Sequence, residues 1–422
     1  MDRVILHADV NNFYASVAIR NNEYLQNKPV VICGDTDKRH GIVLAKSNLA
    51  KKAGIKTGDT LGMAYKLCSD LICLPPDYKE YTTTSNLIYN IYKRFTPLVE
   101  SFGLDECWLD VTGTLSQYDN NPMLIANIIK DTVKSEIGVT ISIGVSFTKV
   151  FAKLGSDLKK PDAITLIDKN NYKKIAWALP VENMLFIGEK IRIKLREDGI
   201  KTIGDLAKAN AKELIKKFGK IGERLYEYAN GLDKEEVGTY YNFNFPESIS
   251  NGTTAQEDIT NDKNAQSMVY SLAEVIAFRL RKYCLLANGV GIYARNTEFE
   301  GFNKQQKLKE PTSDARIIGE VAFDLLRKNC CISEGNPIRQ ITVATYDFVE
   351  EETIHQNTIF DSKEYKNLIT NKKLDKIRQK YGFGVLKKAI ELDDVFICDA
   401  KEIDDDFLPF DKSKNVRNET KD

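Results

Sequence analysis

The chain has 422 residues, of which 42% are hydrophobic and 28% charged, and its 60 basic residues balance 60 acidic ones. This length exceeds one ordinary hydrophobic core and predicts about three or four modules. The sequence contains no apolar run long enough to cross a bilayer and no N-terminal export signal, so we expect a cytoplasmic protein without a membrane partner. Its eight cysteines form no CxxC pairs with zinc spacing, which favours reduced thiols over a zinc site.

The balanced total hides an uneven distribution of charge. Positions 169–224 hold about 14 basic and 7 acidic residues, whereas 391–411 hold about 9 acidic residues and 1 basic residue. A basic middle segment suits a phosphate backbone, and an acidic C-terminal segment would be repelled from it. The alternative is a basic helical surface that is merely solvated.

The N-terminal part of the chain predicts a ferredoxin-like unit that carries an insertion. An apolar strand over 4–9 and a helix over 13–20 come first. A helix, a hairpin, a second helix and a last strand follow in the order of that unit, over 81–95, 97–111, 122–137 and 139–145. The region 14–76 is expected to form the insertion, with short strands at 30–32 and 41–45 and a short helix at 47–53.

The middle of the chain, from 167 to 233, has a helical pattern and two segments in which glycines lie beside lysines. Glycine between helices lets backbone amides approach a phosphate closely, and lysine adds charge. The candidate DNA-binding residues are Gly188, Lys190, Gly219, Lys220 and Gly222. The alternative is that these glycines only end helices. A linker near 240–247 leads into a mixed module with a helix over 268–283 and a strand over 340–346.

Three carboxylates lie where predicted strands end or turn. Asp9 ends the first strand, and Asp105 and Glu106 fall at the bend of the hairpin. One acid from a strand and two from a neighbouring hairpin could hold two divalent cations about 3.5 to 4 Å apart. Hard oxygen ligands at a phosphate-handling site favour Mg²⁺, with Mn²⁺ as a substitute. The alternative is a solvated acidic bend, because Asp and Glu tolerate turns.

These residues resemble the Y-family translesion DNA polymerases of the DinB and UmuC kind. The segments HADVNNFYASV, LAKSNLAKKAGIKTGD, FGLDECWLDVT and TKVFAKLGSDLKKP occur in the family's order. The likeness covers 4–350 and continues more weakly to 386. It implies an α+β multidomain fold with a ferredoxin-like palm (1–14 and 77–166), small fingers (15–76), a helical thumb with helix-hairpin-helix-like loops (167–240), a C-terminal α/β little-finger domain (245–350) and a C-terminal tail (351–422).

The resemblance also assigns roles to residues of the site. Asp9, Asp105 and Glu106 would be catalytic and would hold two Mg²⁺ ions with the Val10 carbonyl. The residues expected around the incoming deoxynucleoside triphosphate are Phe13, Tyr14, Ser47, Lys51 and Lys160, with Tyr14 as a steric gate. Ile42 and Leu44 would roof the nascent base pair. The alternatives are core-filling roles for the apolar and aromatic residues and a solvated surface for the lysines.

One part of the pattern departs from many DinB-type members of the family. Asn48 and Lys51 stand where those members carry Tyr and Arg. Lysine supplies a point charge without the bidentate fork of arginine. The departure favours the UmuC-like branch.

The function implied is a monomeric, template-directed DNA polymerase that extends a primer across damaged DNA without proofreading. A nucleotidyl cyclase with a related palm and a non-catalytic DNA-bound recruitment protein are the alternatives. The segment with Gln356, Ile359 and Phe360 resembles the peptide by which bacterial polymerases bind the sliding clamp. By pattern alone it could also be a chance pentapeptide in a polar connector.

Overall fold

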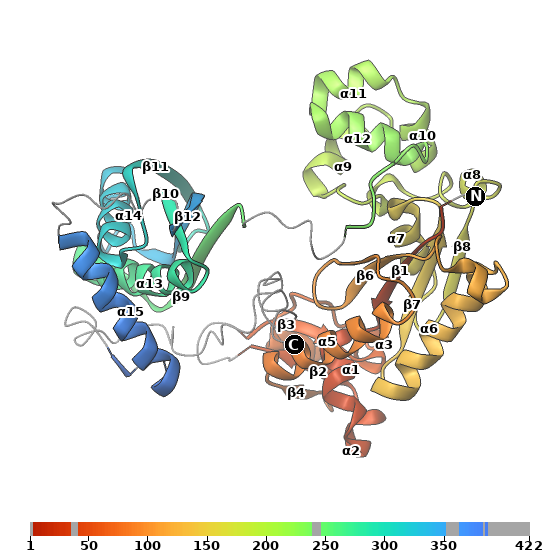
Figure 1. Ribbon diagram of the computed structural model, residues 1–422, viewed down its shortest axis with the longest axis horizontal. Coiled ribbons are helices and arrows are strands. Elements are labelled where there is room, and N and C mark those ends of the chain that lie inside the picture. The colour runs from red at the N-terminus through yellow and green to blue at the C-terminus, as the bar shows by residue number, and fades with distance from the viewer. Residues whose placement is uncertain (1–2, 35–40, 239–245, 352–362, 383–384, 387–422) are drawn as a thin grey trace. The chain divides into compact units, whose positions relative to one another are not determined.

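The computed structural model describes residues 3–34, 41–238, 246–351, 363–382 and 385–386 (Figure 1). The chain divides between residues 243 and 244 into two compact units. The first unit contains a five-stranded and a three-stranded sheet, and the second contains a four-stranded sheet. Among the residues just given, no helix is long and apolar enough to cross a membrane.

The five-stranded sheet of the first unit, here called the palm sheet, has the strand order β5-β6-β1-β7-β8. Its central strands β1 (Ile5–Val10) and β7 (Ile141–Ser146) are buried at every residue. They are buried because helices cover both faces of the sheet. Helices α5 (Tyr78–Lys93) and α6 (Pro122–Ile137) share one hydrophobic core with it, and α7 (Lys149–Leu158) packs on the other face.

The chain order of the palm sheet confirms the predicted ferredoxin-like unit. Strand β1, helix α5, the hairpin of β5 (Val99–Ser101) and β6 (Glu106–Asp110), helix α6 and strand β7 follow one another. Asn121 caps α6, and Gly138 ends it in the left-handed conformation that glycine adopts easily. Helix α7 and the edge strand β8 (Ile164–Ile167) extend the unit and had not been predicted as elements.

The insertion between β1 and α5 begins with α1 (Phe13–Arg20), which packs on the palm, and α2 (Glu23–Gln26). It then forms its own sheet, β3-β2-β4, from β2 (Val30–Cys33), β3 (Val43–Lys46) and β4 (Ile72–Leu74). Helices α3 (Asn48–Lys52) and α4 (Leu61–Leu67) contribute to a separate small core.

The expectation of reduced thiols is wrong for one pair of cysteines in this insertion. Cys33 and Cys73 form a disulfide between β2 and β4. These strands are parallel neighbours, so cysteines 40 positions apart in sequence come within reach of each other. Cys68, Cys107, Cys284, Cys330 and Cys331 are free thiols, as expected.

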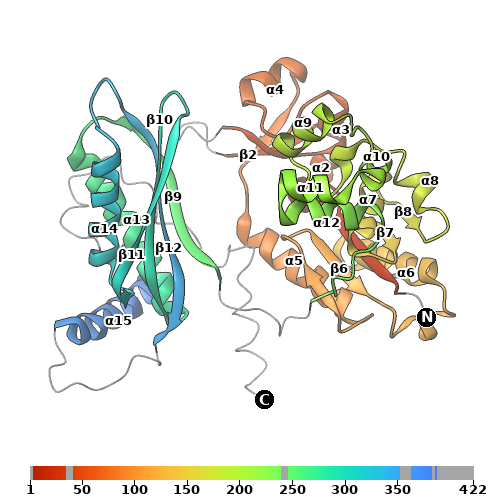
Figure 2. The same ribbon diagram turned by 90° about the horizontal axis from the view of Figure 1, so that it is seen from above.

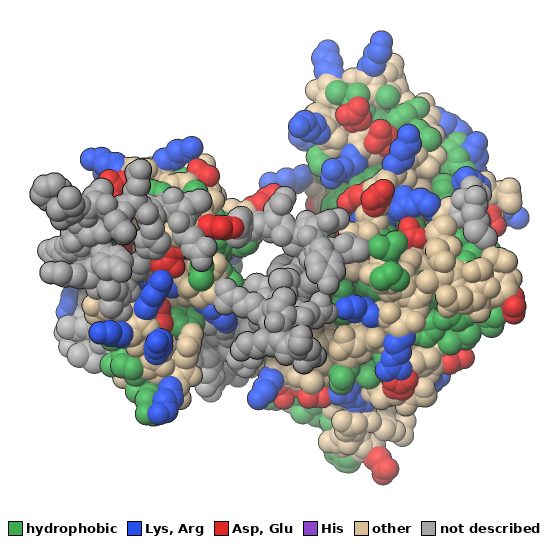
Figure 3. All heavy atoms as spheres, viewed as in Figure 1, with side chains coloured by type: hydrophobic (Ala, Val, Ile, Leu, Met, Phe, Trp, Pro, Cys, Tyr) green, Lys and Arg blue, Asp and Glu red, His purple; other side chains and the backbone are tan. Residues whose placement is uncertain are grey.

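The helical part of the first unit surrounds a third core formed mainly by buried aliphatic side chains. Its helices are α8 (Tyr172–Ile175), α9 (Glu189–Glu197), α10 (Ile203–Lys208), α11 (Ala211–Phe218) and α12 (Lys220–Ala229). Gly219 alone separates α11 from α12 and has a φ of 63°, which allows the sharp turn between them. Figure 3 shows Lys and Arg side chains over this helical end of the unit.

The second unit is built on a four-stranded antiparallel sheet in the order β11-β10-β12-β9. Helices α13 (Asp262–Lys282) and α14 (Ala315–Asn329) pack on one face of that sheet (Figure 2). The long strands are β9 (Ser248–Ile259), β10 (Leu285–Asn296), β11 (Gly301–Thr312) and β12 (Ile338–Glu350). The predicted helix 268–283 and strand 340–346 lie mainly within α13 and β12.

A further helix, α15 (Lys363–Tyr381), belongs to the second unit and had been expected only as part of a tail. Its Asp375 accepts two hydrogen bonds from the buried Arg281 of α13, at 2.5 and 2.9 Å. Arg378 of α15 pairs with the buried Glu274 of α13 at 3.0 Å. These contacts fix α15 to α13.

Candidate active site

The palm sheet brings the three predicted acids together. Asp9 of β1 lies directly opposite Glu106 of β6 in the antiparallel register. The backbone amide of Val10 donates to the carbonyl of Asp105 at 3.0 Å, which holds the turn residue beside the end of β1. Side chains alternate between the two faces of a strand. Because Ile5 packs with Ala152 of α7, alternation places Asp9 on the same face as α7.

Two lysines from the α7 segment contact these acids. The Lys160 Nζ lies 2.7 Å from Asp9 Oδ2, and the Lys153 Nζ lies 2.5 Å from Glu106 Oε2. Lys160 was a predicted site residue, whereas sequence reasoning missed Lys153. The sequence feature that could have identified Lys153 is its place in the segment TKVFAKLGSDLKKP, seven residues before Lys160.

Buried His7 completes the surroundings of Glu106. Its Nε2 lies 3.5 Å from Glu106 Oε2, and its Nδ1 is 2.8 Å from the hydroxyl of Ser156 on α7. Burial lowers the pKa of His7. Burial would raise the pKa of Glu106, but its contacts with His7 and Lys153 outweigh burial and lower that pKa to about 2. Glu106 is therefore held as a carboxylate.

The other two acids are shifted in the opposite direction. Burial raises the pKa of Asp9 to about 7 in spite of Lys160, and the nearby acids Glu106 and Asp105 add to the rise. Burial and the charge of Glu106 raise the pKa of Asp105 to about 6. Crowded carboxylates repel one another, so this cluster favours any added positive charge.

Asn11 was also missed by sequence reasoning, and it positions the loop that carries Lys160. Its side-chain amide donates to Ser142 Oγ at 2.9 Å, and its Oδ1 accepts from Thr140 Oγ1 and from the amide of Asp162. The side chain is buried, so these hydrogen bonds are shielded from water. A polar residue two positions after Asp9, at the end of an apolar strand, was the available signal.

The donor chemistry of the three acids fits hard divalent cations. Within the described part of the chain, no three acidic, histidine or cysteine side chains already form a metal-binding cluster. One oxygen of Asp9 and one of Glu106 are engaged by lysines. Burial, followed by the charges of the neighbouring acids, raises the pKa values of Asp9 and Asp105, and a bound cation would oppose both effects.

Tyr14 lies at the start of α1 in a group of aromatic rings. Its ring stacks on Tyr81 at 4.2 Å between centroids and meets Tyr78 edge-on at 6.3 Å. Burial raises the pKa of Tyr14 to about 12, so its hydroxyl stays protonated. The ring is only partly buried and is held rigidly by Tyr81. Phe13, in contrast, is 4% exposed within the palm core, which leaves only its backbone accessible to a ligand.

The insertion carries four of the residues that are predicted to lie near the incoming nucleotide or the nascent base pair. The Ser47 hydroxyl caps α3 by accepting from the Ala50 amide and also accepts from Val30, so its observed contacts are structural. Lys51 lies exposed on α3. Ile42 is 44% exposed and Leu44 partly so, on the strand face opposite the fully buried Val43. Core filling therefore does not explain Ile42.

The predicted glycine segments occupy two different settings. Gly188 is the N-cap of α9 and Gly219 joins α11 to α12, with Lys190 and Lys220 in the first turns that follow. Gly222 lies inside α12, where a Cβ atom would come 2.1 Å from the Leu214 carbonyl oxygen. Close packing of α12 on α11 explains that glycine. The predicted clamp peptide with Gln356, Ile359 and Phe360 lies outside the described residues.

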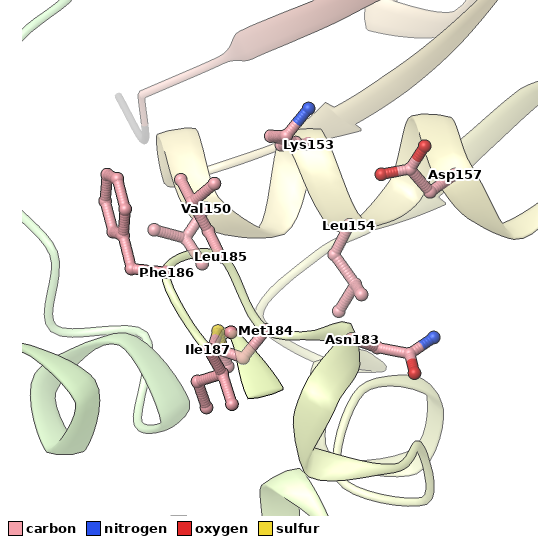
Figure 4. Close-up of a pocket in the computed structure, with 10 residues that line it drawn as sticks. Val150, Lys153, Leu154, Asp157, Asn183, Met184, Leu185, Phe186 and Ile187 are labelled. Atoms are coloured by element: carbon pink, nitrogen blue, oxygen red, sulfur yellow. The ribbon is translucent and has the colours of Figure 1, made fainter. Parts of the chain in front are cut away.

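A pocket of about 300 Å³ lies between α7 and the segment that leads into α9. Lys153, Leu154 and Asp157 of α7 form one side of it, and Met184 and Ile187 lie opposite (Figure 4). Figure 4 shows the Lys153 ammonium directed away from Met184 and Ile187. The ammonium instead pairs with Glu106.

An acid cluster on a ferredoxin-like palm, with a basic helical segment and a separate mixed module, defines the class of nucleotidyl-transferring polymerases. Comparison with known proteins narrows this class. Residues 8–157 match the impB/mucB/samB family, 246–359 match the C-terminal domain of that family, and 186–233 match the thumb domain of DNA polymerase-iota.

Two relatives are similar over almost their whole length. A DNA polymerase IV of Acetivibrio thermocellus is 40% identical, and the match covers 93% of this chain and 98% of the relative. A DNA polymerase IV of Clostridium acetobutylicum is 36% identical, and the match covers 93% of this chain and 99% of the relative. The chain belongs to the Y-family of translesion DNA polymerases.

A solved Y-family DNA polymerase chimera, Dbh-Dpo4(243-245)-Dbh, shares the fold. Its TM-score is 0.74 at 22% identity, and the match covers 82% of this chain and 99% of that one. The predicted fold class and enzyme class are thus confirmed, which sets aside the cyclase and recruitment-protein alternatives. The preference for a UmuC-like branch is not supported, because both relatives are DinB-like polymerases IV. Asn48 and Lys51 are therefore a local departure within that branch.

Proposed function

We propose that this chain extends a primer on a DNA template by two-metal phosphoryl transfer at Asp9, Asp105 and Glu106. The observation that carries the proposal is the cross-strand pairing of Asp9 with Glu106, with Asp105 tied to the Val10 amide. Two Mg²⁺ ions, or Mn²⁺ in their place, would bind these carboxylates and the Val10 carbonyl. Such ions would favour the ionised primer 3′-oxygen and neutralise the departing pyrophosphate.

The residues on either side of the acids would receive the deoxynucleoside triphosphate. Lys160 and the exposed Lys51 supply positive charge for its phosphates, and the Tyr14 ring limits the space beside its sugar. Phe13 and Ser47 would contribute only backbone or hydroxyl contacts, because both side chains are buried in structural roles.

Primer-template DNA would bind through backbone amides and lysines at Gly188, Lys190, Gly219 and Lys220, with Gly222 keeping α11 and α12 close. The face of the second-unit sheet opposite α13 and α14 presents small residues, among them Gly252, Gly291 and Ala344. Small side chains allow a sheet to approach a DNA backbone closely.

We assign the palm to 1–14 and 77–166, the fingers to 15–76, the thumb to 167–240, the little finger to 245–350 and a tail to 351–422. The docking of α15 on α13 supports extending the little finger to Tyr381. Because each assigned module has another role, we expect no proofreading, and the chain would act as a monomer in the cytoplasm.

Primer extension by the purified chain tests the proposal directly. A labelled primer on a longer template should be extended with Mg²⁺ and deoxynucleotides, and chelation of the metal should stop the reaction. Extension that persists in excess chelator would contradict two-metal transfer. The absence of excised primer would test the lack of proofreading, and the molar mass of the purified chain in solution would test the monomeric state.

Replacing Tyr14 by Ala should admit ribonucleotides, because it removes the ring that is stacked on Tyr81. The preference for deoxynucleotides, measured as the ratio of kcat/KM values, should fall by at least about tenfold. Tyr14→Phe is the matched control, since it keeps the ring and removes only the hydroxyl. An unchanged ratio in Tyr14→Ala would show that another residue selects the sugar.

The exposed side chains of Ile42 and Leu44 would roof the nascent base pair and limit the size of accepted adducts. The double change Ile42→Ala with Leu44→Ala should increase bypass of a bulky adduct by about threefold or more relative to bypass of an abasic site, because it creates space. Leu67→Ala removes an exposed side chain from α4 instead and serves as the control. Equal bypass ratios in the parent and the double variant would show that Ile42 and Leu44 do not limit the size of accepted adducts.

The peptide containing Gln356, Ile359 and Phe360 would bind the sliding clamp. Apolar side chains can anchor in a pocket of the partner, and tethering then raises the effective concentration of the enzyme at the primer end. The double change Ile359→Ala with Phe360→Ala should leave extension without the clamp intact. It should reduce the stimulation of extension by a loaded clamp at least about tenfold. Equal stimulation of the parent and the double variant would exclude this peptide as the attachment point.

A further inference from the structure

Lys153 has no role in the mechanism proposed above, although it makes the shortest ion pair of the site. Its Nζ lies 2.5 Å from Glu106 Oε2 and 5.2 Å from the centre of the Phe102 ring. The Lys153 side chain is 15% exposed, so water screens this pair only weakly. The lysine is therefore a strong and specific partner of one proposed metal ligand.

An ammonium group and a divalent cation cannot both occupy the space in front of Glu106 Oε2. They compete for the same lone pairs, and their positive charges repel each other at close range. His7 Nε2 lies on the same oxygen at 3.5 Å, which leaves little free space around it. Binding of a cation to this oxygen therefore requires Lys153 to turn away.

A second position for the ammonium exists on the same helix. Asp157 lies one turn after Lys153 on α7, and both residues line the pocket described above (Figure 4). Residues four positions apart on a helix are neighbours on its surface. Asp157 already holds Lys160, with Oδ1 2.9 Å from the Lys160 Nζ. A carboxylate has two oxygens and can accept from more than one donor, so Asp157 can accept Lys153 while it holds Lys160.

We propose that Lys153 is a positioning residue that competes with divalent cations for Glu106 and moves to Asp157 when a cation binds. The exchange keeps Glu106 in place with either partner and sets the threshold concentration at which the metal enters. Asp157 lowers this threshold by stabilising the displaced lysine. The inference rests on the proposed metal site and adds to it a control over its occupancy.

The two residues should affect metal affinity in opposite directions. Mn²⁺ binding can be followed by the electron paramagnetic resonance of free Mn²⁺, with the full-length protein and without DNA or nucleotide. Lys153→Met should bind Mn²⁺ about threefold to tenfold more tightly than the parent, because it removes the competitor. Asp157→Asn should bind it about twofold to threefold more weakly, because the displaced ammonium loses its acceptor.

Two control variants separate competition from a general effect of charge. Lys153→Arg keeps the positive charge at Glu106 and should bind Mn²⁺ within about twofold of the parent. Lys212→Met removes the same charge from an exposed position on α11 and should leave the affinity unchanged. Thermal unfolding supplies a second readout. Added Mn²⁺ should raise the unfolding midpoint of Lys153→Met by more than that of the parent.

Unchanged or weaker Mn²⁺ binding by Lys153→Met would overturn the proposal, because it would show that Lys153 orients Glu106 for the ion. Tighter binding by Asp157→Asn would overturn the role of the acceptor. These outcomes differ from a failure of the proposed metal site itself. In that case the parent chain would bind no Mn²⁺, and Asp9→Asn would change nothing.

Discussion

Asp105→Ala is expected to abolish primer extension while leaving DNA binding close to that of the parent chain. Asp105 lies at the turn before β6, tied through its carbonyl to the Val10 amide, and its carboxyl group projects from a crowded acid cluster. The substitution removes one metal-binding carboxylate but keeps this backbone contact. We expect single-turnover extension to fall by about 10³-fold or more, since stabilisation of charge in the transition state is the largest catalytic effect available.

A matched control lies at the other end of the same strand. Asp110 ends β6 and lies 3.7 Å from Arg3, away from the paired Asp9 and Glu106. Asp110→Asn should retain extension within about threefold, because the hydrogen bond from Thr112 to its side chain can persist. DNA affinity is measured separately with labelled primer-template. Substantial extension by Asp105→Ala would refute the assignment of the active site.

Gly144→Ala is expected to destabilise the palm more than any other glycine-to-alanine substitution in it. An added Cβ would lie 1.8 Å from the Ala152 carbonyl oxygen and 2.5 Å from the Ser156 amide nitrogen. Both contacts are with the backbone of α7, so no flexible side chain can move aside. The helix must shift away from β7, and we expect a loss of about 3 kcal/mol or more in the free energy of unfolding.

Chemical denaturation of the purified variants measures this effect. Gly62→Ala is the control, because Gly62 lies in α4 with no atom within 4 Å of an added Cβ. That change should alter stability by no more than about 1 kcal/mol, in the stabilising direction, since alanine is the better helix former. Equal stabilities for Gly144→Ala and the parent would show that α7 can move without cost.

The sequence was sufficient to predict the ferredoxin-like unit and to single out the three acids that the palm sheet brings together. Alternating or helical apolar spacing marks β1, α5 and α6, and the acids stand where strands end or turn. The cap at Asn121 and the stop at Gly138 are local signals that a single sequence carries. These features depend on neighbours along the chain, and such neighbours are visible without a structure.

Features that depend on packing between distant segments could not be predicted in this way. The contact of Lys153 with Glu106 arises only because α7 packs across β1, and these residues are 47 positions apart. The disulfide between Cys33 and Cys73 likewise needs the parallel pairing of β2 with β4. Helix α15 has weak amphipathic character, and its attachment depends on charged partners on α13. Sequence spacing alone identifies none of these partners.

The direct opposition of Asp9 and Glu106 in adjacent strands has a genetic consequence. Because side chains alternate across a sheet, a shift of one residue between β1 and β6 would turn Glu106 to the α5 side of the palm. A substitution at Leu104 changes one side chain, but an inserted or deleted residue in this turn changes the alignment of the whole strand. Gly103 has a φ of 86°, which disfavours other residues there. The short turn should therefore accept replacements of Leu104 more readily than any change in its length.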